Sequence, residues 1–319
     1  MPPPIAALVG PTGSGKTELA LAIGRRLPIE ILVADSRQVY RGMSVGTAKP
    51  DAAARNAVRH HLLDLVDPDQ PFSVADWVAR AREIIPQVAE RGALPVLVGG
   101  TGLYLSALID GFQLEAQPRS PQIGERLRAE LARDGPAFLA DRLRTIDPDT
   151  AALVDLRNPR RLLRALERAE AAGGPAAELV TATPYSGPVV MTGIRRPRDE
   201  LYRRIDLRAA ALFEGDLLNE VRALLAAGFD LSLPPLTGHG YREAARVLTD
   251  GWSLELAIAQ TARHTRQYAR RQLSWFRRDP RIVWLEAGDR PADEHAIVER
   301  AVDLLRPLSD RARAMAASG

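Results

Sequence analysis

The first hundred residues alternate between short apolar runs and segments in which apolar residues recur at helical intervals. Ile5 to Val9 has the length of a buried strand, and Glu18 to Leu27 follows with helical spacing. Two more apolar runs, Ile29 to Val33 and Leu94 to Val98, lie on either side of a helical pattern over Val74 to Ala89. Strands separated by helices predict a parallel α/β sheet.

The pattern changes between Glu115 and Pro184, where helical spacing dominates and turn signals interrupt it. Asn158 and Pro159 have the N-cap and first-turn chemistry of a helix that continues as RRLLRALERAEAA. The run PVVMTGI then predicts a strand that returns to the sheet, and the remainder is expected to be helical, with a fraying tail rich in Ala and Arg. We therefore predict a helical insertion within an α/β core.

Length and composition agree with this division. A chain of 319 residues exceeds the size at which one hydrophobic core stops growing. We expect a core domain of residues 1–114 and 185–319 and an insertion domain of residues 115–184. Apolar content of 46% and charged content of 26% are typical of globular proteins. The absence of cysteine, of a membrane-length apolar run and of a signal segment predicts a cytoplasmic protein without disulfides.

Candidate chemistry concentrates where the predicted strands end. The segment GPTGSGKT matches the phosphate-binding pattern G-x-x-x-x-G-K-[ST], and it lies between a strand and a helix as that pattern requires. Its glycines let backbone amides turn inward, Lys16 and the helix N-terminus add positive charge, and Thr17 offers a hydroxyl to Mg²⁺. A nucleotide such as ATP is the usual ligand of this loop. The predicted phosphate site consists of Gly10, Pro11, Thr12, Gly13, Ser14, Gly15, Lys16 and Thr17.

Two other strand ends should converge on the same site, because ligands bind at the carboxyl ends of parallel strands. Asp35 follows the second strand; it either holds or deprotonates an acceptor, or it caps the next segment. The third strand ends in Gly99, Gly100 and Thr101. A nucleotide hydrolase usually places an Asp at such an end to organise Mg²⁺ and water. Thr101 contacts a phosphate or acceptor group, or caps the following helix.

A basic, aromatic-bearing segment lies in the C-terminal third. Between Thr261 and Arg281 there are seven arginines and one acidic residue. Such a helix suits the phosphates and stacked bases of RNA; the alternative is a solvated helix whose aromatic side chains enter the core. The adjacent His60 and His61 are expected to be structural, and the role of His239 stays open. The helical face comprises Arg263, Arg266, Arg270 and Arg277, with Trp275 and Phe276 between arginines.

Together these motifs resemble the bacterial tRNA dimethylallyltransferases, also called tRNA isopentenyltransferases. The resemblance covers roughly Ala7 to Arg278, and the ordered occurrence of DS-x-Q-VYRGM and VGGTGLY after the loop is highly specific. The chain departs from the family pattern in three places. Arg157-Asn158-Pro159 stands where Asn-Asp-Pro is expected, His239 stands where an aliphatic residue is expected, and the segment from Pro175 to Pro188 is short. The other matching segments are HHLLDLVDP, NPRRLLRALE, LYRRIDLR, GHGYREA and TRQYARRQLSWFRR.

The resemblance implies a P-loop NTPase-like fold whose loop binds the diphosphate of dimethylallyl diphosphate. The prenyl group would move to the exocyclic amine of the adenosine just 3′ of the anticodon. It also implies that Asp35 is the general base, that Lys16 and Mg²⁺ at Thr17 neutralise the diphosphate, and that Thr101 and Arg208 contact it. The helical insertion would grip the anticodon stem-loop, and we expect a monomer. The implied tRNA-binding residues are Asp35, Ser36, Arg37, Gln38, Thr101, Arg160, Arg161, Leu162, Leu163 and Arg164.

Three alternatives stay open on the sequence. An adenylate isopentenyltransferase would use the same loop and base on a free nucleotide, but such a small acceptor needs neither the insertion nor the basic helix. A small-molecule kinase would bind ATP tightly and transfer a phosphoryl group. A non-catalytic RNA-binding protein with a degenerate nucleotide site would bind RNA independently of Asp35.

Overall fold

The chain folds into two compact units. The computed structural model describes residues 2–111, 120–175, 183–288 and 290–318. The core unit consists of Met1–Asp110 and Tyr185–Gly319, and the insertion unit of Gly111–Pro184. The boundary predicted at Glu115 lies outside the described residues.

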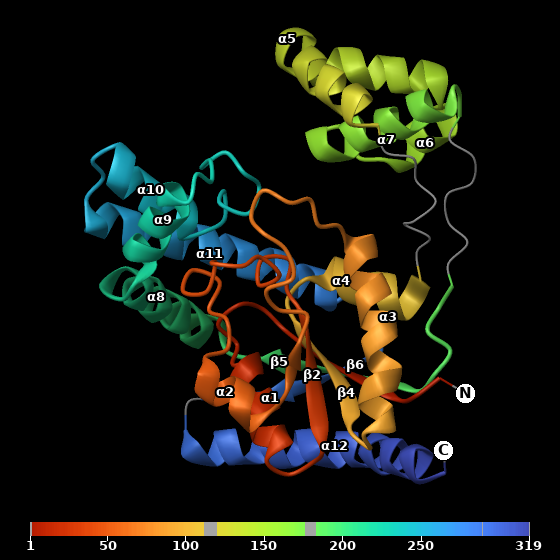
Figure 1. Ribbon diagram of the computed structural model, residues 1–319, viewed down its shortest axis with the longest axis vertical. Coiled ribbons are helices and arrows are strands. Elements are labelled where there is room, and N and C mark those ends of the chain that lie inside the picture. Colours follow the sequence, from red (N-terminus) through yellow and green to blue (C-terminus); the bar gives the residue numbers. More distant parts are fainter. Residues whose placement is uncertain (1, 112–119, 176–182, 289, 319) are drawn as a thin grey trace. The chain divides into compact units, whose positions relative to one another are not determined.

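The core unit is built on a parallel sheet, which confirms the predicted fold class (Figure 1). In the described chain the strand order is β3-β2-β4-β1-β5-β6, and every neighbouring pair is parallel. The central strand β1 is fully buried because helices cover both faces of such a sheet. The strands are β1 (Ile5–Val9), β2 (Ile29–Ala34), β3 (His60–His61), β4 (Leu94–Gly99), β5 (Val189–Arg195) and β6 (Ile282–Glu286).

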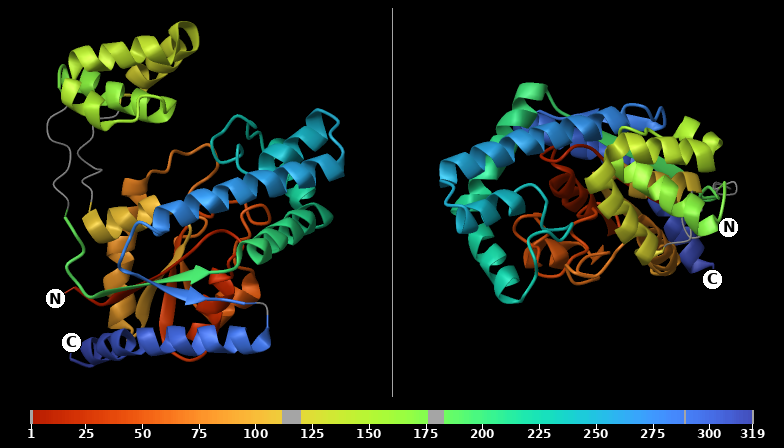
Figure 2. Two further views of the ribbon diagram at one scale, coloured as in Figure 1. Left: turned by 180° about the vertical axis from the view of Figure 1, so that it is seen from behind. Right: turned by 90° about the horizontal axis from the view of Figure 1, so that it is seen from above.

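Helices of the core unit surround the sheet. Figure 2 shows α11 crossing above the strands, and α12 running along the opposite end of the sheet. Leu305 of α12 joins Leu19 and Ile23 of α1 in one buried cluster with the strands. These helices are α1 (Lys16–Gly24), α2 (Ala52–Ala57), α3 (Val74–Glu90), α4 (Gly102–Ser106), α8 (Arg198–Glu214), α9 (Leu217–Ala226), α10 (Tyr241–Thr249), α11 (Leu254–Phe276) and α12 (Pro291–Ala317), and a π-helical turn covers Ala107–Gly111.

The C-terminal region differs from the sequence prediction in two respects. Residues Ile282–Glu286 form the edge strand β6 instead of helix; Ile282 and Leu285 are buried, and the strand pairs with β5. The tail does not fray, because α12 continues to Ala317 and buries Ser309 and Ala312 completely. Packing against the sheet and its flanking helices, which local composition does not reveal, explains both differences.

The insertion unit is helical in its described part. Its helices are α5 (Pro121–Ile146), α6 (Pro148–Leu153) and α7 (Pro159–Ala172), and α5 is kinked at Gly135, where φ is 80°. The predicted cap of α7 is confirmed: the Asn158 side chain accepts hydrogen bonds from the amides of Arg160 and Arg161. Leucines of α5 and α7 form a separate hydrophobic core, so this unit is stabilised by its own interior.

Candidate active site

The loop after β1 forms a phosphate cradle in which the lysine is already positioned. Gly13 and Gly15 have φ of 84° and 97°, which side chains rarely adopt, and Gly15 is the N-cap of α1. The Lys16 ammonium donates hydrogen bonds to the carbonyls of Gly10 (2.9 Å) and Pro11 (2.8 Å). The loop therefore holds Lys16 through its own carbonyls at the start of the helix.

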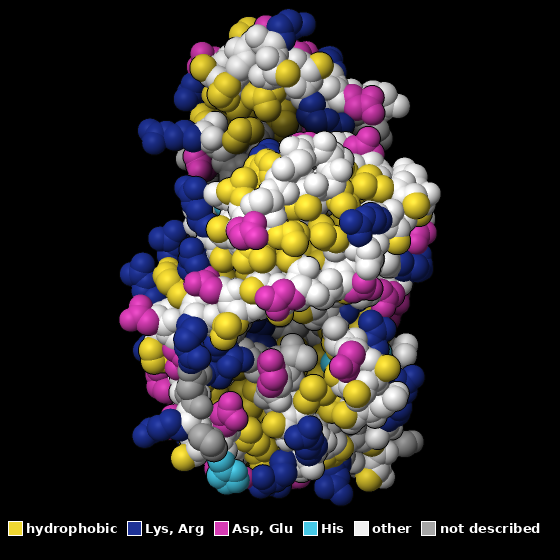
Figure 3. All heavy atoms as spheres, turned by 90° about the vertical axis from the view of Figure 1, so that its left-hand side faces the viewer, with side chains coloured by type: hydrophobic (Ala, Val, Ile, Leu, Met, Phe, Trp, Pro, Cys, Tyr) yellow, Lys and Arg dark blue, Asp and Glu magenta, His cyan; other side chains and the backbone are white. Residues whose placement is uncertain are grey.

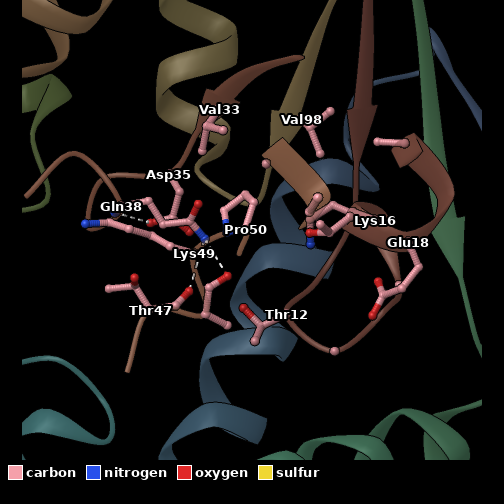
Figure 4. A pocket seen from close by; sticks show the side chains of 18 of the residues that line it. Thr12, Lys16, Glu18, Val33, Asp35, Gln38, Thr47, Lys49, Pro50 and Val98 are labelled. Carbon is pink, nitrogen blue, oxygen red and sulfur yellow. Dashed lines mark hydrogen bonds between the residues drawn. The ribbon is translucent and has the colours of Figure 1, made fainter. Parts of the chain in front are cut away.

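A cavity of about 680 Å³ opens at the carboxyl ends of β1, β2 and β4. Figure 4 shows Thr12 and Lys16 entering it from the loop, and Asp35 and Gln38 entering from the segment after β2. The predicted convergence of strand ends is therefore realised. Its wall also includes the loop residues Gly13, Gly15 and Thr17, the apolar residues Ile31, Val33 and Val98, and Gly99, Gly100, Arg204, Leu207 and Arg208.

The electrostatics of the cavity favour an anionic ligand. Burial lowers the pKa of Lys16 to about 8, and the negative charge of Asp35 partly opposes that shift. Burial also lowers the pKa of Arg208, which comes from α8 and lines the same cavity. A buried cation is stabilised by an opposite charge, so a bound phosphate group would favour the protonated form of Lys16.

For Asp35 the structure shows the capping role, one of the two between which the sequence left a choice. Its Oδ1 accepts hydrogen bonds from the backbone amides of Arg37 (2.8 Å) and Gln38 (3.3 Å), so the residue does cap the following turn. Its Oδ2 accepts no hydrogen bond from the described residues. Since the cap fixes one oxygen, the other is held at the cavity, where it is free to accept a proton.

Thr101 follows β4 and connects the end of that strand to the turn that begins at Asp35. It is the N-cap residue of α4, but its side chain makes no capping bond, so the alternative of a simple helix cap is wrong. Instead its Oγ1 accepts the amide of Ser36 at 3.3 Å, and its side chain hydrogen-bonds with Tyr268 of α11. Thr101 therefore orients the turn that carries Asp35.

Gln272 of α11 is a site residue that sequence reasoning missed. Its Oε1 accepts the amide of Thr12 at 2.8 Å, and its Nε2 donates to the carbonyl of Gly100 at 2.9 Å. One side chain thus joins the phosphate loop to the turn after β4. Only its position within the predicted basic helix hinted at a role near the site.

Two arginines support the outer side of the phosphate loop, and these were also missed. Arg196 Nε donates to the carbonyl of Ser14 (2.9 Å), and Arg204 Nε donates to that of Gly13 (3.0 Å). These two bonds hold the Gly13 and Ser14 carbonyls against α8 and the segment that leads into it. The motif LYRRIDLR thus supplies Arg204 to the loop backbone and Arg208 to the cavity.

The long polar loop after Asp35 is folded around Lys49, the second of the two lysines in the chain. Its ammonium donates to the Tyr40 carbonyl and to Asp64 Oδ1 at 2.6 Å. Gln38 Nε2 donates to the carbonyls of Thr47 (3.0 Å) and Ala48 (3.3 Å). These bonds give a defined shape to the loop from Gln38 to Lys49, which forms one wall of the cavity.

The histidines have structural surroundings. His61 Nε2 lies 2.6 Å from Glu30 Oε2, and His60 Nδ1 lies 2.7 Å from the carbonyl of Val58, as expected for structural residues. His239 stacks with His264 at 5.9 Å between ring centroids, and burial lowers its pKa to about 4. No group of three or more His, Cys, Asp or Glu residues in the described chain could hold a metal ion.

The basic helix α11 is neither fully solvated nor fully buried. Arg266 pairs with Asp206 of α8, and Phe276 enters the core, whereas Trp275 is 44% exposed. The prediction that the aromatic side chains enter the core therefore holds for Phe276 and not for Trp275, and RNA binding by this helix stays a prediction. On the face drawn in Figure 3, basic side chains are interspersed with acidic and hydrophobic ones, so that face has no uniformly basic patch.

The predicted tRNA-binding turn of the insertion unit needs one correction. Arg160 and Arg161 are exposed at the start of α7, and Arg164 pairs with Glu167 at 2.7 Å. Leu162 is completely buried in the core of the unit, so its side chain cannot contact RNA. The amphipathic spacing of α7 turns this leucine inward, Leu163 is partly buried against the same core, and Arg160 and Arg161 face solvent.

A phosphate loop that faces a carboxylate across one pocket of a parallel sheet defines a group-transfer enzyme of the P-loop class. The chain belongs to the IPP transferase family, whose model matches residues 38–279, and the isopentenyl transferase model matches residues 3–67. It is 43% identical over 96% of its length to a tRNA dimethylallyltransferase of Syntrophobacter fumaroxidans, of which 89% is covered. The corresponding protein of Thermobifida fusca is 42% identical, with 96% and 95% covered.

Solved structures give the same assignment. The full-length tRNA isopentenylpyrophosphate transferase of Bacillus halodurans matches with a TM-score of 0.71 at 36% identity, covering 99% of both chains. A eukaryotic dimethylallyltransferase acting on tRNA matches with a TM-score of 0.72 at 22% identity, covering 92% of this chain and 78% of that one, which supports the fold alone. The predicted family, fold class and transferase activity are therefore confirmed.

Proposed function

We propose that this protein transfers the dimethylallyl group of dimethylallyl diphosphate to the exocyclic amine of the tRNA adenosine on the 3′ side of the anticodon. One observation carries the proposal: a phosphate cradle and an oriented carboxylate, Asp35, share a single cavity. The end of β4 contributes Gly99, Gly100 and Thr101 to this region, whereas hydrolysis of a nucleotide usually needs an Asp at such a position. The cavity therefore favours group transfer over nucleotide hydrolysis.

The residues around the cavity divide the reaction between them. The bond between the prenyl C1 and the diphosphate oxygen breaks, the diphosphate leaves with the electron pair, and a bond forms from the adenine nitrogen to C1. The Oδ2 of Asp35 takes the proton from that nitrogen, which is the role of a general base. Lys16, the loop amides and Arg208 stabilise the charge that develops on the leaving group. Thr101 orients the Asp35 turn through its hydrogen bond with the Ser36 amide.

We also propose that Mg²⁺ takes part. Thr17 lies at the cavity, as the loop pattern requires, and the described residues supply no ligand cluster that would hold a metal alone. This fits Mg²⁺, which usually combines one or two protein ligands with phosphate oxygens and water. Bound there, it would supply further neutralisation of the diphosphate charge.

The tRNA would be bound through the turn at Asp35–Gln38 and through the exposed Arg160 and Arg161 of the insertion unit. We propose that the protein is a cytoplasmic monomer. As a separate finding, no helix in the described part of the chain is both long and apolar enough to cross a membrane.

The decisive experiment uses dimethylallyl diphosphate with a labelled prenyl group, incubated with tRNA, with AMP, or with neither acceptor. Label in tRNA at the adenosine beside the anticodon supports the proposal. Label in AMP would instead identify an adenylate isopentenyltransferase. A parallel incubation with γ-labelled ATP tests for a kinase. Lys16→Ala is the matched control, since it removes the cation at the diphosphate and leaves the exposed arginines unchanged.

A further inference from the structure

Helix α9 and the motif GHGYREA have no part in the proposed chemistry, yet both contact the loop that follows β2. Glu220 of α9 accepts hydrogen bonds from three consecutive backbone amides of that loop. Its Oε2 accepts the amides of Ser44 and Val45, each at 2.7 Å, and its Oε1 accepts the amide of Gly46 at 3.1 Å. The Tyr241 hydroxyl, from the motif, also donates to Oε1. One carboxylate therefore receives four hydrogen bonds, two on each oxygen.

The three amides form a small anion site, and we call Ser44–Gly46 the amide turn. The turn is closed by its own contacts, since Thr47 Oγ1 donates to the Met43 carbonyl at 2.6 Å. Consecutive amides that converge on one point attract negative charge, as they do at the N-terminus of a helix. Glu220 supplies that charge from a helix 174 to 176 residues further along the chain.

The conformation of this loop is imposed by its contacts. The buried ring of Tyr241 packs so closely on Gly46 that a Cβ there would lie 2.4 Å from a ring carbon. Two residues further on, Ala48 has φ of 48°, a left-handed conformation that is uncommon for residues other than glycine. Such backbone strain persists only where the surroundings hold it, and it is concentrated at functional sites. The bonds to Glu220 are among the contacts that hold it here.

The amide turn leads directly into the wall of the active-site cavity. The carbonyls of Thr47 and Ala48 accept hydrogen bonds from Gln38 Nε2 at 3.0 and 3.3 Å. The Gln38 amide in turn donates to Asp35 Oδ1 at 3.3 Å. Figure 4 shows these side chains of Asp35, Gln38 and Thr47 on one side of the cavity. Glu220 does not itself line the cavity, so it can act on the reaction only through this chain of bonds.

We propose that Glu220 is a positioning residue for the transfer step. Its carboxylate holds the amide turn, the turn holds Gln38, and Gln38 helps to fix the Asp35 carboxylate that accepts the proton. The inference rests on the proposed function, since it assumes a reaction at Asp35. It also gives the GHGYREA motif a role, because Tyr241 supplies a hydroxyl to the carboxylate and a ring to the turn. A displacement of about 1 Å near the reacting atoms can reduce a rate roughly a hundredfold.

The test measures steady-state prenyl transfer to tRNA by variants at this position. Glu220→Ala removes all four contacts and leaves room for a small carboxylate. Its kcat should fall roughly tenfold to a hundredfold, while the KM for dimethylallyl diphosphate stays unchanged. Sodium formate should restore much of the rate, because formate offers two oxygens to the same donors. Sodium chloride at equal ionic strength should not.

Glu220→Gln separates charge and acceptor geometry from packing. The glutamine keeps the shape of the side chain, but its NH₂ group cannot accept a hydrogen bond from the donors on that side. Its kcat should also fall, and formate should not restore it, because the amide fills the site. Arg222→Ala is the matched control, since Arg222 is exposed on the same helix and donates to Asn219. It should behave as the wild type in every assay.

Wild-type kcat in both Glu220 variants would overturn the inference and leave the proposed function intact. Equal rates of Glu220→Ala in formate and in chloride would also overturn it, as would a KM for dimethylallyl diphosphate that rises in step with the loss of kcat. Should Glu220→Ala fail to fold, Glu220→Gln decides: a wild-type kcat overturns the inference, and a reduced kcat with unchanged KM supports it. A wild-type protein that transfers no prenyl group refutes the proposed function itself, and the inference falls with it.

Discussion

Gln272 offers a sharp test of how the site is assembled, because a single amide joins two loops. The partners fix its orientation: the Thr12 amide can only donate and the Gly100 carbonyl can only accept. Gln272→Met keeps the length of the side chain but leaves both backbone groups without a partner. Each buried group left unsatisfied costs about 1–3 kcal/mol, so the variant should lose about 2–6 kcal/mol of unfolding free energy. That is a large part of the typical total of about 5–15 kcal/mol.

Gln272→Glu separates the two hydrogen bonds. A carboxylate can still accept the Thr12 amide, but it cannot donate to Gly100, and it adds negative charge beside the diphosphate site. The folded state should therefore raise the pKa of this glutamate. When the pH falls below the folded and unfolded pKa values, the protonated side chain can donate again, so the stability deficit should shrink in acid. Gln272→Met should show no such recovery.

Urea denaturation between pH 4 and 8 measures both effects, and steady-state kinetics with saturating tRNA measures the KM for dimethylallyl diphosphate. Both variants should raise that KM, since the phosphate loop loses its tie to the turn after β4. Wild-type stability and KM in Gln272→Met would refute the view that this amide holds the loop in its binding geometry.

Three further predictions concern the proposed roles. Affinity for dimethylallyl diphosphate should fall as pH rises above about 8, because unliganded Lys16 then loses the proton that the bound anion requires; a flat calorimetric profile from pH 7 to 9.5 would contradict this. Asp35→Asn should lower kcat about a hundred- to ten-thousandfold with little change in either KM, and a kinetically normal variant would eliminate the general-base role. Arg160→Glu with Arg161→Glu should weaken tRNA binding and reduce its dependence on log salt by about two units, leaving the KM for the diphosphate substrate unchanged; an unaltered salt slope in filter binding would show that this turn does not touch the RNA.

The sequence predicted those parts of the site that local chemistry encodes. GPTGSGKT is a contiguous pattern whose flanking strand and helix are also visible, and the Asn158 cap depends only on its neighbours. Asp35 was found for the same reason, because it directly follows an apolar strand.

What the sequence could not supply depends on contacts between distant segments. Gln272 lies 260 residues from the Thr12 amide that it binds, and no spacing rule links the two. The short strand β6 gains its identity from pairing with β5 at the sheet edge. The opposite fates of Trp275 and Phe276 follow from how α11 is rotated against the core, which the arginine pattern alone does not determine.

The strand order has a consequence for how the protein is made. Strand β1 is synthesised first, yet one of its two partners, β5, is encoded beyond the whole insertion unit, and the buried face of α12 follows later still. The insertion unit is continuous in sequence, so it can fold as soon as it leaves the ribosome. The core must wait roughly ten seconds more for about 120 residues at typical elongation rates of about 5–20 residues per second. For most of that interval the sheet lacks its edge strand β6 and the covering helix α12, and nascent chains stalled after the insertion should be the ones that chaperones hold longest.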